Sequence, residues 1–374
     1  MDNKRFMLRC LAVALVLGGS MIGCQKSTSG TIKIGAIAPL TGPGAEYGKW
    51  AQRGVDLARQ EAEKLSSGVQ IQVVWEDSQL NPTTAVSALL KLADSDKVPL
   101  ILGPLTSGET IPCVPKAAEK GVVVLSPTAT SDKLTDVGEY FFRVRPTNRV
   151  QADAAAKFCR ASLKATTAYV LNEEIAYGAD LAGAFAERFE ALGGKVVARD
   201  SYREGTTEYR PVIQKIRAAN PDVVYLPSNY TEAGTFLRQL AQLGVKKKVV
   251  GGDGSYGKEL IDIAGAAAEG TYWTTIAWGT GEDKAAAESF RQRYQASYGE
   301  PPHQFAGLYY DAARLAFQAV TRANMTGKDV RAALLALPPF HGATGTTKFT
   351  AKGQVEKSFA LYVVKDGDFR QVEP

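Results

Sequence analysis

The side chains of this chain that are best suited to binding a ligand are two hydroxyl groups and one carboxylate. Ser107 and Thr130 fall where helices or helical turns are expected to begin, and the free N–H groups of a helix N-terminus suit a carboxylate. Asp253 follows a β-rich run and lies between glycines, where its carboxylate suits a cation such as an ammonium. The 374 residues include two histidines and four cysteines, which argues against a histidine-dependent triad or a metal cluster. These residue types predict noncovalent capture of a small polar ligand, without an enzymatic step, a cofactor or a metal.

Each of these residues also has a simpler interpretation. Serine and threonine commonly cap helices, and aspartate in a Gly-Asp-Gly run commonly forms a turn. Residues 252–257 also spell G-x-G-x-x-G after an expected strand, but Ala277 and Trp278 stand where a dinucleotide site needs an acid. A phosphate loop is excluded as well, because Glu259 occupies the position of the Ser or Thr that would hold magnesium.

The loops that carry these residues share one composition. They follow the carboxyl ends of expected strands, where open α/β sheets bind ligands, and they are rich in glycine, small hydroxyl residues and tyrosine. Tyr47, Tyr177 and Tyr230 each lie in such a loop, where they are expected to wall a cleft or, alternatively, to pack over the loops. The loops cover residues 39–48, 104–110, 126–132, 172–178, 227–232 and 252–257.

Strands and helices alternate along the chain from Thr31 onward. Continuous apolar strands separated by amphipathic helices predict parallel sheets covered on both faces, and their number favours two α/β lobes with a joint near 145–147. Late in the chain, short strands pair locally around Asp366-Gly367, which indicates more than one crossing between the lobes. Strands are expected at 32–38, 70–76, 98–103, 122–126, 141–146, 166–172, 195–199, 222–227, 247–252 and 271–277, and helices at 45–65, 176–192, 208–219, 231–243, 283–298 and 304–324.

The first thirty residues have the pattern of an export signal. Basic residues precede an apolar stretch that is shorter than the roughly 20 residues of a transmembrane helix. The stretch ends in Met-Ile-Gly before Cys24, which resembles a bacterial lipobox, although Met21 stands where leucine is favoured. We therefore expect a lipoprotein signal peptide over 1–23, lipid on Cys24 and a tether over 24–30, the alternative being an ordinary cleaved signal.

The distribution of charge argues against one class of function, and the cysteines bear on whether the folded body contains a disulfide. The formal net charge of +5 is spread along the chain and its tightest basic run is Lys246–Lys248, which argues against nucleic-acid binding. Cys113 and Cys159 are the cysteines left in the folded body, and each falls in an expected helix. An exported protein permits a disulfide between them, but two separate buried thiols are the favoured interpretation.

Six segments are spread in order over most of the chain, namely IGAIAPLTGPGAEYG, ILGPLTSGET, VVVLSPTATSDKLT, FFRVRPTN, DVVYLPSNYTEAGTFLRQL and VVGGDGSYGKELIDIAGAAAEG. Through these segments the chain resembles the periplasmic branched-chain (Leu/Ile/Val) amino-acid binding proteins, which are the extracytoplasmic receptors of ABC importers. The resemblance implies a two-lobed type I periplasmic binding protein fold with three hinge crossings, and it covers residues from about 31 to 369. Lobe 1 would hold 31–146 and 277–347, and lobe 2 would hold 147–276 and 348–374.

The same resemblance implies how a ligand would be held. A ligand carboxylate would meet Ser107 and Thr130, and its ammonium would meet the backbone carbonyl of Thr128 and the carboxylate of Asp253. Tyrosines 47, 177 and 230 would close the cleft around the ligand. Asp253 is one methylene shorter than the glutamate of the family pattern, and Thr128 replaces a smaller residue, so the preferred ligand side chain stays open.

The function implied is that of a monomeric, lipid-anchored receptor in the periplasm or at the cell surface, which is not an enzyme. It would capture a branched-chain or other apolar amino acid and deliver it to an ABC permease in the inner membrane. Two alternatives remain within the same fold: a receptor for another small solute, such as an amide or an aromatic acid, and a ligand-sensing subunit. Asp253 argues against ligands that lack a cation.

Overall fold

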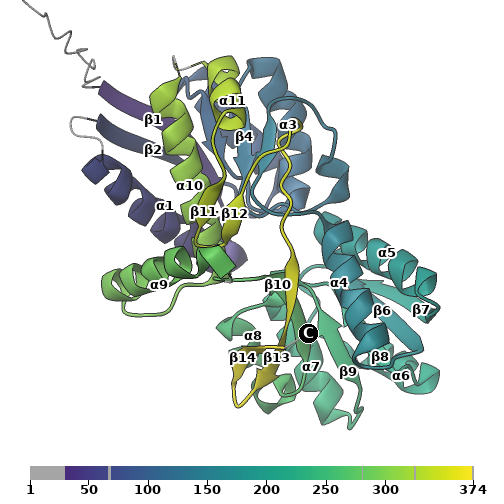
Figure 1. Ribbon diagram of the computed structural model, residues 1–374. Coiled ribbons are helices and arrows are strands. Elements are labelled where there is room, and N and C mark those ends of the chain that lie inside the picture. Colours follow the sequence, from purple (N-terminus) through teal and green to yellow (C-terminus); the bar gives the residue numbers. More distant parts are fainter. Residues whose placement is uncertain (1–29, 66–68, 280, 324–325, 373–374) are drawn as a thin grey trace, which may run out of the picture.

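A computed structural model describes residues 30–65, 69–279, 281–323 and 326–372. Two lobes, each built on its own sheet, are joined by extended crossing segments (Figure 1). The expected signal peptide, Cys24 and the tether up to residue 29 lie outside the described residues, whereas Gly30 begins a strand. Within the described part, no helix is both long and apolar enough to cross a membrane.

The first sheet is parallel throughout and has the order β2-β1-β3-β4-β5. Because β1 pairs with both β2 and β3, the strand order reverses beside it, which is where doubly wound sheets open a crevice for ligands. The strands are β1 (Gly30–Ala38), β2 (Val69–Asp77), β3 (Leu100–Leu102), β4 (Val123–Ser126) and β5 (Phe141–Arg143).

Helices cover both faces of this sheet. Ile34 and Ala36 face one core with α1 and α10, whereas Ile37 faces a second core with α2 and α3. Gly54 lets α1 approach α10, since a Cβ there would lie 2.1 Å from the carbonyl oxygen of Ala306. The helices are α1 (Ala45–Leu65), α2 (Pro82–Asp94), α3 (Ser107–Lys120), α9 (Lys284–Tyr298), α10 (Gln304–Arg322) and α11 (Gly327–Leu335), with the small hairpin β11 (Phe340–Gly342) and β12 (Gly345–Thr347) beside them.

The second sheet repeats the first and then adds an antiparallel hairpin. Its parallel part, β7-β6-β8-β9-β10, has the same order as the first sheet, and β13 then pairs antiparallel with β10 and with β14. The predicted parallel sheets are thus confirmed for both cores, with the locally paired strands at one edge. The strands are β6 (Thr167–Glu173), β7 (Lys195–Tyr202), β8 (Val223–Leu226), β9 (Lys248–Gly251), β10 (Tyr272–Ile276), β13 (Phe359–Lys365) and β14 (Asp368–Gln371).

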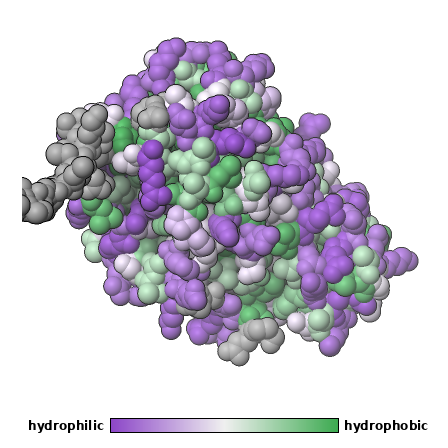
Figure 2. Space-filling model, turned by 45° about the horizontal axis from the view of Figure 1, so that its top comes forward, coloured by the Kyte–Doolittle hydropathy of each residue, from purple (hydrophilic) through white to green (hydrophobic). Residues whose placement is uncertain are grey.

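The helices of the second lobe are α4 (Asn148–Ala161), α5 (Ala176–Ala191), α6 (Arg210–Ala219), α7 (Tyr230–Gln242) and α8 (Lys258–Ala264). Side chains of α4 and α5 pack in one core, and those of α6, α7 and α8 pack on the other face of the sheet. Hydrophilic side chains cover most of the face shown in Figure 2. Among the described residues, Leu65 and Val150 are the large hydrophobic side chains that stand exposed.

The chain passes between the lobes after β5, after β10 and before β13. Residues just after β12 still pack on the first lobe, because Phe349 contacts Phe142 with ring centroids 5.1 Å apart and Arg143 N–H donates to the Gly353 carbonyl at 3.0 Å. We therefore propose that the third crossing follows Val355, later than the boundary at 347/348 that the resemblance implies.

The two cysteines of the folded body lie apart. Cys113 is on α3 in the first lobe and Cys159 is on α4 in the second, and both are free and buried. Burial raises the pKa of each thiol to about 12, so neither is a reactive thiolate. The prediction of two separate buried thiols is confirmed.

Candidate functional site

A cavity of about 310 Å³ lies between the lobes, where the carboxyl ends of the strands of both sheets meet. Its volume is at the small end of the range for ligand pockets, which is about 300–1,000 Å³. Ser107, Thr128, Thr130, Tyr47, Tyr177 and Asp253 all line it, so most of the residues singled out in the sequence are brought together. Apolar side chains form much of the remaining wall, namely Leu80, Pro82, Leu105, Ile175, Ala176 and Phe305.

The start of α3 forms one end of the cavity. Thr106 caps the helix in a capping box with Glu109, while Ser107 and Gly108 line the cavity with first-turn N–H groups that have no partner within the helix. The Ser107 hydroxyl oxygen accepts hydrogen bonds from the N–H groups of Thr130 at 3.2 Å and Ser131 at 3.1 Å. Its own proton is therefore free to be donated to a ligand oxygen, and this end of the cavity suits a carboxylate.

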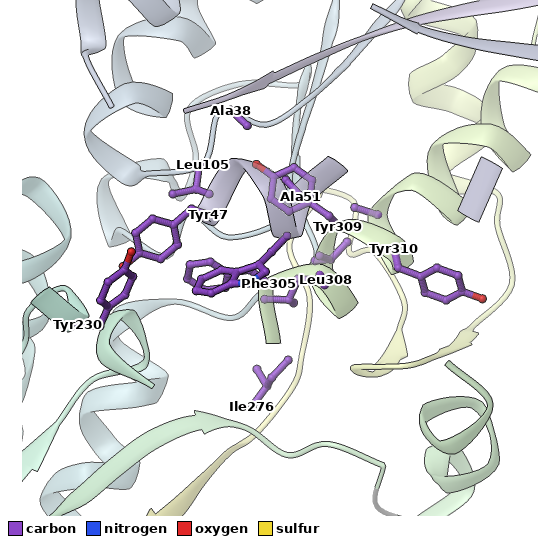
Figure 3. Close-up of a cluster of buried hydrophobic side chains, with 14 of the residues drawn as sticks. Ala38, Tyr47, Ala51, Leu105, Tyr230, Ile276, Phe305, Leu308, Tyr309 and Tyr310 are labelled. Atoms are coloured by element: carbon purple, nitrogen blue, oxygen red, sulfur yellow. The ribbon is translucent and has the colours of Figure 1, made fainter. Parts of the chain in front are cut away.

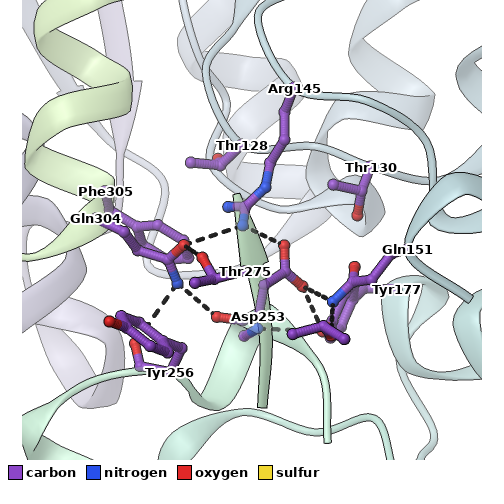
Figure 4. Close-up of polar contacts among 12 residues, drawn as sticks. Thr128, Thr130, Arg145, Gln151, Tyr177, Asp253, Tyr256, Thr275, Gln304 and Phe305 are labelled. Atoms are coloured by element: carbon purple, nitrogen blue, oxygen red, sulfur yellow. Dashed lines mark hydrogen bonds and ion pairs between the residues drawn. The ribbon is translucent and has the colours of Figure 1, made fainter. Parts of the chain in front are cut away.

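The two threonines after β4 have different surroundings. The Thr128 hydroxyl donates to the carbonyl of Leu105, so it is used inside the lobe. Thr130 lines the cavity next to Ser107, and in Figure 4 the two threonine side chains lie on either side of Arg145. Thr130 is thus the threonine whose hydroxyl is available to a ligand.

An aromatic wall closes the cavity on one side (Figure 3). Tyr47 of the first lobe packs against Phe305 at 5.3 Å and against Tyr230 of the second lobe at 5.0 Å between ring centroids. Its hydroxyl donates to the carbonyl of Gly254, also in the second lobe, at 3.3 Å. Tyr230 packs behind Tyr47 and does not itself line the cavity, where the adjacent Asn229 does.

Asp253 lies in the second lobe, in the turn after β9, and its carboxylate is surrounded by donors (Figure 4). Oδ1 accepts from the Tyr177 hydroxyl at 2.7 Å and from Gln151 Nε2 at 3.0 Å, and Oδ2 lies 2.5 Å from Arg145 Nη2. Arg145 Nη2 also donates to Gln304 Oε1 at 3.0 Å. The chain therefore supplies its own cation to Asp253, a role that the sequence alone assigned to a ligand.

This ion pair is buried, with side-chain exposures of 1% for Arg145 and 4% for Asp253. Burial lowers the pKa of the Arg145 guanidinium and the Asp253 carboxylate opposes that change. Burial, followed by the charge of Asp253, raises the pKa of Tyr177 well above its ordinary value, so the phenol stays protonated and donates.

Arg145, Gln151, Gln304 and Phe305 are site residues that the sequence reasoning missed. Arg145 carried a signal, because two arginines alternate in the apolar run FFRVRP and a buried cation needs a partner. Arg143 turns away from the cavity, donating to the Ser131 carbonyl at 2.9 Å and to Thr135 Oγ1 at 2.8 Å.

His303 has a structural role. His303 caps α10 through Nδ1, which accepts from Phe305 N–H at 3.2 Å, and its ring stacks on Trp50 at 3.7 Å between centroids. Burial lowers the pKa of His303 to about 3, so the ring is neutral. In the described part of the chain, no three His, Cys, Asp or Glu side chains come together in a way that could hold a metal ion.

Comparisons with known proteins give one consistent result. Residues 31–368 match the sequence model of a family described as periplasmic binding protein. The Leu/Ile/Val-binding protein BraC3 of Rhizobium johnstonii is 32% identical over 340 residues, which cover 88% of this chain and 91% of that protein. The leucine-, isoleucine-, valine-, threonine- and alanine-binding protein of Pseudomonas aeruginosa is 28% identical over 339 residues, or 89% of each chain.

Two solved structures share the architecture. The leucine-binding protein LivK of Thermotoga maritima superposes with a TM-score of 0.86 at 28% identity, covering 91% of this chain and 98% of its own. LivJ of Streptococcus pneumoniae, a branched-chain amino acid transporter substrate-binding protein in complex with isoleucine, has a TM-score of 0.85 at 30% identity and covers 92% and 100%.

Proposed function

Since the chain belongs to the periplasmic binding protein family, we propose that it captures an apolar amino acid in the interlobe cavity and delivers it to an ABC permease. The family consists of solute-binding receptors that work outside the cytoplasm, and it is not a family of enzymes. The expected two-lobed fold agrees with this role, because a ligand held between lobes can favour their closed arrangement.

The observation that carries this proposal is the polarity of the cavity. At one end, the first turn of α3 and the hydroxyls of Ser107 and Thr130 offer donors to a carboxylate. Elsewhere around the cavity, Leu105, Phe305 and the other apolar side chains offer a dry wall to a hydrocarbon group. A small carboxylic acid with an apolar side chain matches both features, and leucine, isoleucine and valine, after which the relatives are named, belong to that class.

The remaining parts of the role follow from the N-terminal pattern. We propose a signal peptide over 1–23 and a lipid on Cys24 that anchors the protein to a membrane on the exported side. We also propose a monomer, because few large hydrophobic side chains are exposed among the described residues. Radiolabelled palmitate tests the anchor, since incorporation must disappear in Cys24→Ala and persist in the wild type.

A thermal-shift panel of the twenty amino acids, followed by titration calorimetry, tests the ligand. We expect leucine, isoleucine or valine to stabilise the protein, by about 2.7 kcal/mol when the ligand is at 100 times its Kd. The proposal fails if neither these amino acids nor carboxylic acids with the same side chains bind. Stabilisation only by amides or aromatic acids would favour a receptor for another solute instead.

A further inference from the structure

The partner of Asp253 bears on the chemical class of the ligand. The family resemblance assigns the place beside this acid to the ligand's ammonium, but in this chain Arg145 occupies it at 2.5 Å. Tyr177 and Gln151 already donate to the other carboxylate oxygen. The acid therefore has a cation and two further donors before any ligand arrives.

Arg145 itself has donors to spare. Its contacts with Asp253 and with Gln304 both use Nη2, so Nη1 takes part in neither, and Nε has no hydrogen-bond partner among the described residues. The side chain lines the cavity and is 1% exposed. A buried guanidinium with unused N–H groups favours a ligand atom that accepts hydrogen bonds.

The same charge disfavours an ammonium. A second cation placed beside the guanidinium would meet a like charge in a site of low dielectric, and Asp253 can neutralise only one of the two. Glu174 and Glu204 also line the cavity and would favour a cation, but both are exposed, so water and salt screen them. Arg145 is thus the cavity-lining cation against which a ligand's second functional group has to fit.

We propose that Arg145 makes the cavity accept 2-oxo or 2-hydroxy carboxylic acids at least as tightly as the amino acid with the same apolar side chain. The inference rests on the proposed function, because it keeps the carboxylate at α3 and the hydrocarbon against the apolar wall. It changes the group on the second carbon from an ammonium, which only donates, to an oxygen that accepts from Arg145.

The wild-type protein provides the first test. Titration calorimetry of the purified protein with leucine, 4-methyl-2-oxopentanoate and 2-hydroxy-4-methylpentanoate compares three ligands that share one side chain. We expect at least one of the oxygen-bearing acids to bind with a Kd equal to or below that of leucine. Leucine binding more tightly than both acids overturns the inference and leaves the proposed function standing. Absence of binding by the valine, isoleucine and leucine series, in amino and oxygen-bearing forms alike, overturns the proposed function as well.

Variants then assign the preference to Arg145. Arg145→Gln removes the charge but keeps a donor near Gln304. The Kd for leucine divided by the Kd for the oxo acid should therefore fall by about tenfold or more, which means that the variant prefers leucine more than the wild type does. Because both affinities are measured on the same folded protein, the ratio is not affected by a loss of stability. An unchanged ratio would remove Arg145 from the selectivity of the site.

Arg143→Gln is the matched control. Arg143 lies two residues earlier, is also fully buried, and bonds to Ser131 and Thr135 without lining the cavity. Its loss should change stability but leave the ratio of the two affinities as in the wild type. A shift of the ratio in Arg143→Gln equal to that in Arg145→Gln would contradict a specific role for Arg145.

Discussion

The Arg145 guanidinium and the Asp253 carboxylate form a buried ion pair that joins the first interlobe crossing to the turn after β9. Gln304 of α10 bonds both partners, accepting from Arg145 and donating from Nε2 to the Asp253 carbonyl at 2.7 Å. The pair therefore contributes to the contact between the lobes as well as to the lining of the interlobe cavity. Its two roles can be separated by measuring stability and affinity on the same variants.

Breaking this pair from one side should destabilise the protein more than removing both charges. Asp253→Ala leaves Arg145 buried without a counter-charge, and such a loss costs about 3–5 kcal/mol of unfolding free energy. The double variant Arg145→Met/Asp253→Ala removes the uncompensated charge and should lose less than the sum of the two single losses. Urea unfolding of the wild type, of Arg145→Met, of Asp253→Ala and of the double variant gives the coupling energy. Strict additivity of the two single losses would show that the pair does not interact energetically.

The hydroxyl of Thr130 should matter for any carboxylate ligand, whatever its second functional group. Thr130→Val keeps the shape of the side chain and removes one donor to the ligand carboxylate, which at about 1.5–3 kcal/mol corresponds to roughly 10- to 150-fold weaker binding. Leucine and its oxo acid should weaken by similar factors, because both carry the carboxylate. Titration calorimetry measures this.

Thr110→Val is the control for that experiment. Thr110 is buried in the same lobe, on α3, but its hydroxyl donates to the Thr106 carbonyl at 2.7 Å and it does not line the cavity. We expect the affinity of Thr110→Val for leucine and for its oxo acid to stay at the wild-type level. Equal effects of the two variants would indicate that Thr130 acts through the packing of the lobe rather than through the ligand.

Much of this architecture could be predicted because its signals are local. Each strand is a short apolar run, and the helix expected at 45–65 is α1 itself. Ser107, Thr130 and Asp253 were found since each directly follows such a run, and the carboxyl ends of parallel strands converge on one edge.

The contacts between distant segments could not be predicted in the same way. The pairing of Arg145 with Asp253 joins residues 108 positions apart, and Gln304 reaches them from a third segment. No periodicity in the chain indicates which acid an arginine will meet after two lobes close on each other. The boundary that we propose near Val355 could not be predicted for the same reason, since it rests on the packing of Phe349 on Phe142, far away in the sequence.

Acid should destabilise the protein partly through His303. Its folded pKa of about 3 lies below the ordinary value of 6.5, so between these values the unfolded chain binds the proton more readily and stability falls as pH falls. From pH 6.5 to pH 4.5 this residue should remove up to about 2.7 kcal/mol of unfolding free energy, because each pKa unit is worth about 1.36 kcal/mol. Urea unfolding at several pH values measures the slope.

His303→Phe retains a ring that can stack on Trp50 and removes the titrating nitrogens. The variant loses the hydrogen bonds of His303 with Phe305 N–H and the Tyr256 carbonyl, so it should be less stable at pH 7. Its stability should nevertheless fall less steeply between pH 6.5 and pH 4.5 than that of the wild type. Parallel curves for the two proteins would mean that other groups account for the acid sensitivity.

Two glycine-to-alanine changes should have opposite effects on stability, because one lies where α1 approaches α10 and the other lies in open space on α5. In Gly54→Ala the new methyl group would lie 2.1 Å from the Ala306 carbonyl oxygen, which is backbone and cannot rotate away. The helices must separate, and we expect a loss of about 1–3 kcal/mol in unfolding free energy, as is typical of overpacking.

Gly183 lies within α5, where the nearest atom to an added Cβ is Arg199 Nη2 at 3.8 Å. Gly183→Ala should therefore stabilise by about 0.4–1 kcal/mol, since alanine restricts the unfolded chain without a clash. Urea unfolding of both variants checks the signs, and stabilisation by Gly54→Ala would contradict the packing of α1 against α10 described above.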